Sequence, residues 1–139
     1  MTRLDWDSYF LQIAETVSLR ADCKRRQVGA VIVDSDHRIV STGYNGTRSG
    51  DIGCLDGGCP RGNLSYEELE GLVTSYDDPN SIGFCISTHA ETNAIFNAPR
   101  KIENATIYIT DPPCLRCAKE LHNHPGIERV IHAPCTNNR

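Results

Sequence analysis

The chain has 139 residues, of which 39% are hydrophobic and 23% are charged, and its net charge is −4 at pH 7. This size and composition suit a globular domain with a buried core. The acidic balance argues against a nucleic-acid partner, because duplex binding requires a basic footprint, but it allows a small nucleotide. No apolar run reaches the roughly 20 residues of a membrane span, and the N-terminus lacks the apolar stretch of a signal peptide. We therefore expect a cytoplasmic protein with no membrane partner.

The seven cysteines bear on function, because disulfides are rare in a reducing compartment. Clustered cysteines are then better interpreted as metal ligands or reactive thiols. The odd count also argues against a disulfide framework.

The first third of the chain predicts a helix followed by a β-hairpin. Apolar residues recur at helical spacing over residues 5–21, with Asp5 as a plausible cap, and we expect the aromatic Trp6, Tyr9 and Phe10 in the core. Two β-branched runs, "VGAVIVD" (28–34) and "RIVSTGY" (38–44), flank a short Ser-Asp-His turn, which suggests an antiparallel pair.

Residues 46–84 form a polar insert rich in Gly, Pro, Asp and Ser. Within it, Ser65 and Glu68 have the spacing of a capping box and can open a short helix that runs to about Val73. So long an irregular segment in a compact domain is usually either functional or disordered.

The remaining chain alternates helices and strands. We expect a helix over 89–98, a strand over 105–110, a helix over 114–123 and a strand over 128–133. The β-α-β steps require parallel crossovers, whereas the first two strands are antiparallel. The predicted fold is a single α/β domain over 1–139, with a mixed sheet and helices on both of its faces.

A possible metal site lies where the last two helices begin. Cys114 and Cys117 are three residues apart, so both thiols lie on one face at a helix N-terminus, where the helix dipole favours thiolate. The pair alone could equally be a redox pair or half of a structural zinc site. His89 starts the preceding helix, and the N-termini of both helices emerge at one edge of the sheet. One His and two Cys leave the fourth zinc position open, as in catalytic sites.

Glu91 has two competing interpretations. The pattern from Thr88 to Glu91 is that of a capping box, which needs no function. Residues i and i+2 also point to different sides of a regular helix, so His89 and Glu91 can converge only at a site off the helix end. The downstream pattern favours catalysis, because His-x-Glu followed by Pro-Cys-x-x-Cys is the signature of zinc nucleobase deaminases, in which the Glu shuttles protons.

With these residues in place, the chain resembles the cytidine deaminase superfamily and, within it, the deoxycytidylate (dCMP) deaminases. The likeness extends from "YFLQIAETVSLRADC" through "VGAVIV", "RIVSTGYNG", "HAETNAI" and "IYITDPPCLRCAKEL" to "GIERVI". It implies a three-layer α/β/α cytidine deaminase-like fold with a five-stranded mixed sheet, assembled as a homo-oligomer, commonly a hexamer. It also implies hydrolysis of dCMP to dUMP and ammonia for thymidylate synthesis, with dCTP and dTTP as possible allosteric effectors.

The resemblance also assigns roles to residues. His89, Cys114 and Cys117 would hold zinc, while Glu91 would pass a proton from water to N3 of the base and then to the departing amine. Asn45 matches a position that contacts the nucleotide, although Asn-Gly also favours turns. Arg25 or Arg26 could bind the 5′-phosphate, where guanidinium recognition is favoured, or could simply form a solvated basic turn.

The chain departs from the resemblance at the position of a His that often accompanies a second, structural zinc. Gly53 precedes Cys54 in "GDIGCLDGGC", where many relatives have His-Cys. An all-thiolate site remains open, since zinc accepts four cysteines; its ligands would be Cys23, Cys54, Cys59 and Cys85. The alternative is that these are inert buried cysteines.

Two further hypotheses concern function. The insert could reshape the pocket, so that the enzyme deaminates another cytosine nucleotide, a nucleoside or RNA. The same fold could also be a non-catalytic zinc module that binds nucleotides. Glu91 separates the two classes, because a binding module does not need a carboxylate beside an open zinc position.

Overall fold

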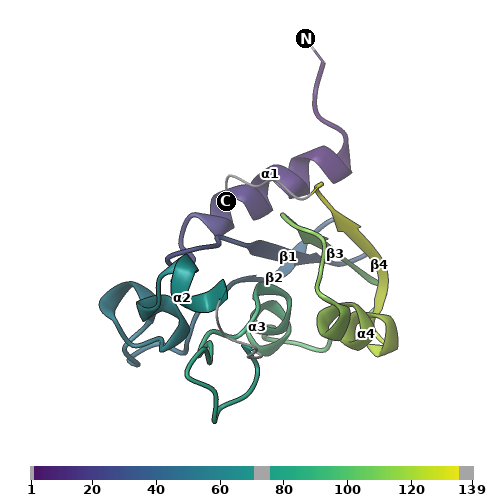
Figure 1. Ribbon diagram of the computed structural model, residues 1–139. Coiled ribbons are helices and arrows are strands. Elements are labelled where there is room, and N and C mark those ends of the chain that lie inside the picture. Colours follow the sequence, from purple (N-terminus) through teal and green to yellow (C-terminus); the bar gives the residue numbers. More distant parts are fainter. Residues whose placement is uncertain (1, 71–75, 135–139) are drawn as a thin grey trace.

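A computed structural model describes residues 2–70 and 76–134 of the chain (Figure 1). The α-helices are α1 (Trp6–Ser18), α2 (Tyr66–Glu70), α3 (Ala90–Phe96) and α4 (Leu115–Asn123), and two short 3-10 helices are η1 (Cys54–Asp56) and η2 (Arg61–Asn63). The strands are β1 (Gly29–Val33), β2 (Ile39–Tyr44), β3 (Ala105–Ile109) and β4 (Ile127–His132). Every helix and strand that the sequence pattern predicts is present in the described residues. No helix within the described ranges is long and apolar enough to cross a bilayer.

The strands form one mixed sheet in the order β2-β1-β3-β4. The hairpin β1–β2 is antiparallel, β1 and β3 are antiparallel, and β3 and β4 are parallel. The parallel pair is joined through α4, as the β-α-β spacing predicts. β2 and β3 both run opposite to β1, so they share one direction although β1 separates them.

The expectation of five strands is wrong for the part of the chain that the structure describes, in which the sheet has four. The fifth strand came from the family resemblance alone. The sequence pattern itself predicts four strands, over 28–34, 38–44, 105–110 and 128–133.

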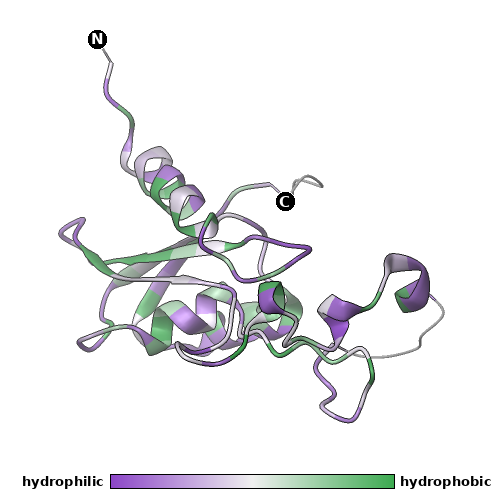
Figure 2. Cartoon of the chain, turned by 90° about the vertical axis from the view of Figure 1, so that its left-hand side faces the viewer, coloured by the Kyte–Doolittle hydropathy of each residue, from purple (hydrophilic) through white to green (hydrophobic). Residues whose placement is uncertain are grey.

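Two apolar clusters, one on each face, produce three layers (Figures 1 and 2). On one face, Phe10 and Ala14 of α1 pack against alternate residues of β1 and β3, namely Val31, Val33 and Tyr108. On the other face, α3 and α4 pack on the intervening positions through residues that include Ala94, Leu121, Ile32, Ile107 and Ile109. Since both faces are covered, all five residues of β1 are buried.

Two of the aromatic residues expected in the core lie on the surface. Phe10 is 1% exposed, but Trp6 and Tyr9 are 53% and 44% exposed. Trp6 stacks on His37 of the hairpin turn, with ring centroids 4.1 Å apart. Helical spacing places these residues near one another on the helix surface, but it does not determine how much of that surface the sheet covers. Only a narrow stripe of α1 is buried.

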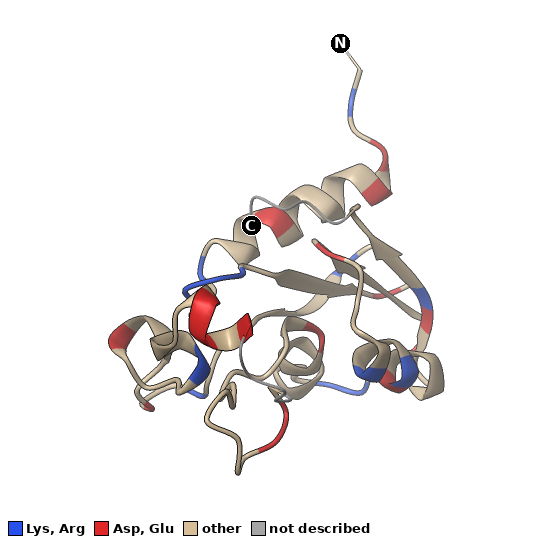
Figure 3. Cartoon of the chain, viewed as in Figure 1, with Lys and Arg blue, Asp and Glu red and all other residues tan. Residues whose placement is uncertain are grey.

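Hydrogen bonds join the two ends of the insert and cap the short helix within it. Gly46 and Thr88 exchange backbone hydrogen bonds of 3.1 and 3.0 Å, which close the loop directly before His89. The predicted capping box is confirmed, since the Ser65 and Glu68 side chains each accept the other residue's N–H at 3.1 Å. The predicted helix end near Val73 lies outside the described residues. The acidic α2 lies beside the basic segment 24–26 (Figure 3).

Candidate active site and metal centre

His89, Cys114 and Cys117 converge as predicted. Nδ1 of His89 lies 3.2 Å from Sγ of Cys117 and 3.6 Å from Sγ of Cys114, and the three atoms all lie within 4.8 Å of one another. Both helices begin at this end of the sheet, so that His89 is the N-cap of α3 and Cys114 is the N-cap of α4. Residues 25 positions apart in the chain therefore meet.

The Thr88–Glu91 capping box is not formed. The N-cap of α3 is His89, which has extended backbone angles and makes no side-chain capping bond. Its imidazole instead faces the two thiols. Cys114 does cap α4, because its sulfur accepts the Cys117 N–H at 3.4 Å.

The three donors suit a zinc ion. Tetrahedral zinc with bonds of about 2.0–2.3 Å holds neighbouring ligand atoms roughly 3.3–3.8 Å apart, close to the two distances measured from His89. Burial raises the pKa of the Cys117 thiol well above its usual range, and the Glu91 carboxylate and Cys114 beside it raise it further. A divalent cation is the group that would hold such a thiol as thiolate.

Glu91 lies in the first turn of α3 and is 4% exposed. Its carboxylate is close enough to Cys117 to act on that thiol. The geometric difficulty of residues i and i+2 is resolved as expected: His89 precedes the helix, so its side chain is not bound to the helical period. A buried carboxylate thus lies next to the metal donors, and both His89 and Glu91 line one pocket.

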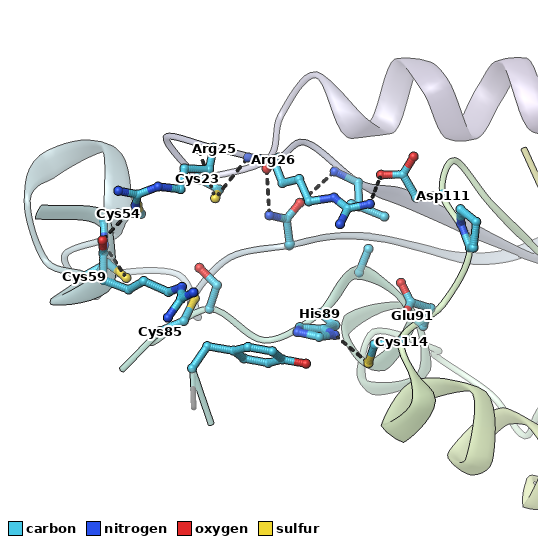
Figure 4. Close-up of a pocket in the computed structure, with 18 residues that line it drawn as sticks. Cys23, Arg25, Arg26, Cys54, Cys59, Cys85, His89, Glu91, Asp111 and Cys114 are labelled. Carbon is cyan, nitrogen blue, oxygen red and sulfur yellow. Dashed lines mark hydrogen bonds and ion pairs between the residues drawn. The ribbon is translucent and has the colours of Figure 1, made fainter. Parts of the chain in front are cut away.

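That pocket has a volume of about 400 Å³ and runs from the metal donors to the insert (Figure 4). At one end lie His89, Glu91 and Cys114, and at the other the insert cysteines. The three arginines that line it are Arg25, Arg26 and Arg61. Its size and mixed lining are those of a site for a small molecule.

Asn45 lines the pocket, but its side chain bonds to backbone. It is 8% exposed; its Oδ1 accepts the Val28 N–H at 2.8 Å and its Nδ2 donates to the Arg26 carbonyl at 3.0 Å. Asn45 therefore fixes the segment that carries both predicted phosphate-binding arginines, and its contact with a nucleotide stays a prediction.

The two predicted arginines differ in their surroundings. Arg25 donates to the carbonyls of Arg61, at 2.7 Å, and Leu64, and its guanidinium lies 5.0 Å from the centre of the Tyr66 ring. Arg26 forms an ion pair of 3.1 Å with the buried Asp111. Arg25 thus braces the insert, whereas Arg26 is tied to the loop that leads to Cys114.

The four cysteines Cys23, Cys54, Cys59 and Cys85 are reduced and line the same pocket. Backbone N–H groups donate to three of the thiols at 3.4 Å: Lys24 to Cys54, Gly62 to Cys59, and both Arg25 and Arg26 to Cys23. Although burial raises the pKa of Cys59, N–H donors and Cys85 lower it by more, so its pKa falls below the usual value. Burial raises the pKa of Cys54 and Cys85. This cluster is looser than the one around His89. Among the described residues, His89, Cys114 and Cys117 are the one group of three or more ligand atoms that all lie within 4.8 Å of one another.

Three pocket residues were not predicted from the sequence. Tyr76 stacks on the His89 ring with centroids 5.8 Å apart, and Arg61 lies 6.0 Å from the Tyr76 ring centre. Both come from the insert and belong to no motif, so no local signal identifies them. Asp111 does have a signal, because it is a charged residue directly before Pro-Pro-Cys and follows a buried strand.

Comparison with known proteins agrees with this site. The model of the cytidine and deoxycytidylate deaminase zinc-binding region matches residues 4–133. The deoxycytidylate deaminase of Mycobacterium phage D29 is 42% identical over 134 residues, covering 95% of this chain and 97% of the phage protein. That of Saccharomyces cerevisiae is 37% identical over 135 residues, covering 96% of this chain but 39% of the yeast protein.

The fold also matches a solved structure, the dCMP deaminase of cyanophage S-TIM5 in complex with dCMP and dUMP. The TM-score is 0.68 at 23% identity, covering 96% of this chain and 85% of that one. The architecture is thus the cytidine deaminase-like fold, with four strands in the described residues. On the family match and the sequence identity, the chain belongs to the cytidine and deoxycytidylate deaminase zinc-binding family.

Proposed function

We propose that this chain catalyses the zinc-dependent hydrolytic deamination of dCMP to dUMP and ammonia, with one zinc held by His89, Cys114 and Cys117. The observation that carries the proposal is the buried Glu91 carboxylate beside these three donors, at one end of a nucleotide-sized pocket. The D29 relative, which this chain covers almost entirely, is named for the same activity.

The residues divide the chemistry between them. Zinc, when bound, supplies a Lewis acid that lowers the pKa of water to about 7. Glu91 accepts the proton of the attacking water and delivers it to N3 while a C–O bond forms at C4. It then takes the remaining proton from the C4 hydroxyl and gives it to the amino group, so that the C–N bond breaks, ammonia leaves and a C4 carbonyl remains. The position of Glu91 favours this role, because the buried carboxylate lies beside the metal donors and lines the pocket.

The test is deamination followed by ultraviolet absorbance. dCMP would be offered alongside CMP, deoxycytidine and dCTP, with purified protein loaded with zinc. We expect rapid conversion of dCMP and much slower conversion of the other three. Turnover of a different member of the panel would assign the enzyme to that nucleotide or nucleoside. A zinc-loaded protein that converts none of them would contradict deamination of cytosine nucleotides. The remaining hypothesis would then be a non-catalytic zinc module that binds nucleotides.

We also propose a second, structural zinc at Cys23, Cys54, Cys59 and Cys85. The N–H donors to three of the thiols support it, because hydrogen bonds of this kind stabilise thiolate. A contraction of the cluster would accompany binding. Metal analysis of the purified protein should give two zinc ions per chain, falling to one in Cys59→Ser with the same preparation. A single zinc in both proteins would leave four inert cysteines.

Further features stay predictions. The sequence itself led us to expect a single domain over residues 1–139 and a cytoplasmic location. The family resemblance alone implies a homo-oligomer such as a hexamer and allosteric control by dCTP and dTTP. Size-exclusion chromatography with light scattering, repeated with each nucleotide, would measure the oligomer and its response.

A further inference from the structure

The insert contributes one wall of the pocket, and two of its residues extend from the metal donors in series. The Tyr76 ring stacks on His89 at 5.8 Å, and the Arg61 guanidinium lies 6.0 Å from the centre of the Tyr76 ring. All three residues line the same pocket. Arg61 therefore reaches the pocket that holds the metal donors, next to the ring that stacks on His89.

Of the three arginines in the pocket, two have their charged groups engaged elsewhere. Arg25 directs both terminal nitrogens at carbonyl oxygens of the insert. Arg26 forms its ion pair with Asp111, so a phosphate would have to compete with a buried carboxylate. Neither arrangement favours a dianionic ligand.

Arg61 differs because its backbone is fixed while much of its guanidinium stays available. Its N–H donates to the Phe84 carbonyl at 2.9 Å, and its carbonyl accepts from Arg25 at 2.7 Å. One terminal nitrogen, Nη1, donates to the Gly83 carbonyl at 3.1 Å. Within the described part of the chain, Nη2 and Nε of Arg61 have no hydrogen-bond partner, and neither atom is fully buried. A half-buried, pre-positioned guanidinium with two free donor groups is suited to a phosphate.

We propose that Arg61 binds the 5′-phosphate of the nucleotide and so makes the enzyme select nucleotides over nucleosides. This inference rests on the proposed function and adds to it the residue that reads the phosphate. It assigns this role to Arg61 in place of Arg25 and Arg26, the two candidates considered from the sequence. Tyr76 contacts both parts of the site, because its ring stacks on His89 and lies 6.0 Å from the Arg61 guanidinium.

The first test compares kinetics of Arg61→Gln with those of the unaltered protein on dCMP and deoxycytidine. Loss of a charge-assisted hydrogen bond should lower kcat/KM for dCMP about 10- to 100-fold, mainly through KM. The preference for dCMP over deoxycytidine should shrink by the same factor. Arg48→Gln is the matched control, since Arg48 lies in the same insert, is 86% exposed and pairs only with Asp51 in the described structure. Its preference should equal that of the unaltered protein.

The second test measures binding without turnover. Calorimetry with dUMP and with deoxyuridine should show that Arg61→Gln weakens dUMP about 10- to 100-fold and deoxyuridine far less. Arg61→Lys should recover only part of the dUMP affinity, because lysine keeps the positive charge but lacks the planar guanidinium that can donate two parallel hydrogen bonds. Thermal unfolding of each variant reports whether loss of the Gly83 contact disturbs the insert.

Three outcomes would overturn the inference. The first is an equal loss of dUMP and deoxyuridine binding in Arg61→Gln, which means a structural role. The second is an unchanged preference in Arg61→Gln together with a lost preference in Arg26→Gln, which moves the phosphate to Arg26. The third is an unaltered protein that binds dUMP and deoxyuridine equally. Failure of dCMP turnover alone would remove the proposed reaction, while the dUMP measurements would still decide on Arg61.

Discussion

At the scale of residues, the site depends on side chains that lie just outside regular helix. His89 and Cys114 are both N-caps with extended backbone angles, so their side chains point off the helix ends toward each other. Glu91 and Cys117 follow within the first turns and lie in the same space. Four residues from two segments thus meet because two helices begin at one edge of the sheet.

Glu91→Gln tests the proton-transfer role directly. The amide has the same shape but cannot accept a proton, so we expect zinc content to stay the same and turnover to fall by about 10²- to 10⁴-fold. Metal analysis and the dCMP assay measure the two effects on one sample. Glu103→Gln, on an exposed carboxylate of the following loop, is the control and should be fully active. An active Glu91→Gln would remove Glu91 from the mechanism.

Gly43 tests how closely α3 must approach the sheet. A Cβ at this position would lie 2.3 Å from the backbone nitrogen of Ala94 and 2.5 Å from the carbonyl oxygen of Ala90. We expect Gly43→Ala to destabilise the fold by about 1–3 kcal/mol and to weaken zinc binding, because α3 carries His89 and Glu91. Urea unfolding measures the first effect. Thr42→Ala, at the exposed neighbouring position, should change stability by less than about 0.5 kcal/mol; equal stability of the two variants would show that α3 has room to move.

At the scale of elements, α1 is held to the sheet by a polar contact as well as by Phe10. The Tyr108 hydroxyl, on β3, donates to Asp7 at 2.7 Å, and Arg129 of β4 bonds to the same carboxylate at 3.3 Å. Burial raises the pKa of Tyr108 to about 12, and Asp7 contributes to the rise. One carboxylate on α1 thus connects two neighbouring strands to the helix.

This contact predicts a pH dependence of stability. Since folding raises the pKa of Tyr108, its contribution is complete below the unfolded value of about 10 and is lost as pH rises from about 10 to about 12. Tyr108→Phe should therefore be less stable than the unaltered protein at pH 8 by roughly 1–2 kcal/mol, and the difference should vanish by pH 12. Denaturant titrations at both pH values measure it. A difference that persists at pH 12 would mean that packing, not the hydroxyl, accounts for the loss.

At the scale of the whole molecule, the metal donors join α3 to α4 through a pocket that the insert closes. Arg116 of α4 also pairs with Asp77 of the insert at 3.1 Å, next to Tyr76. The catalytic end, the insert and the last βαβ unit therefore form one connected structure. Loss of the metal should therefore lower stability well beyond the metal ligands themselves.

Removal of zinc should lower stability as well as activity. At a free zinc concentration 100-fold above Kd, binding stabilises the native state by about 2.7 kcal/mol, or roughly 10 °C in Tm for a chain of this size. Thermal unfolding with and without a chelator, followed by return of zinc, measures the effect. Magnesium in place of zinc is the control and should not restore Tm, because thiolates do not favour it. An unchanged Tm after complete removal would contradict a bound zinc in the folded protein.

The sequence was sufficient for elements and metal donors because both are encoded locally. Hydrophobic period located the helices and strands, and the spacing in His-x-Glu and Pro-Cys-x-x-Cys located the donors. Burial on α1 was less predictable, since Trp6 and Tyr9 depend on how far the sheet extends over the helix. The capping box predicted at Thr88 is absent for a related reason. Thr88 pairs with Gly46 in a β-bridge, and α3 therefore has His89 as its N-cap, one residue later than the pattern suggests.

By itself, then, the sequence determined the order of elements, the α/β class and the His, Cys and Glu residues of the site, all of which depend on short-range spacing. The tertiary structure alone decided which arginine has donors available in the pocket. The sequence offered Arg25 and Arg26 and did not mark Arg61. The contacts that distinguish the three cross the fold: carbonyls of the insert for Arg25, Asp111 for Arg26, and the Tyr76 ring beside His89 for Arg61. Such contacts join residues far apart in the chain, and no local pattern encodes them.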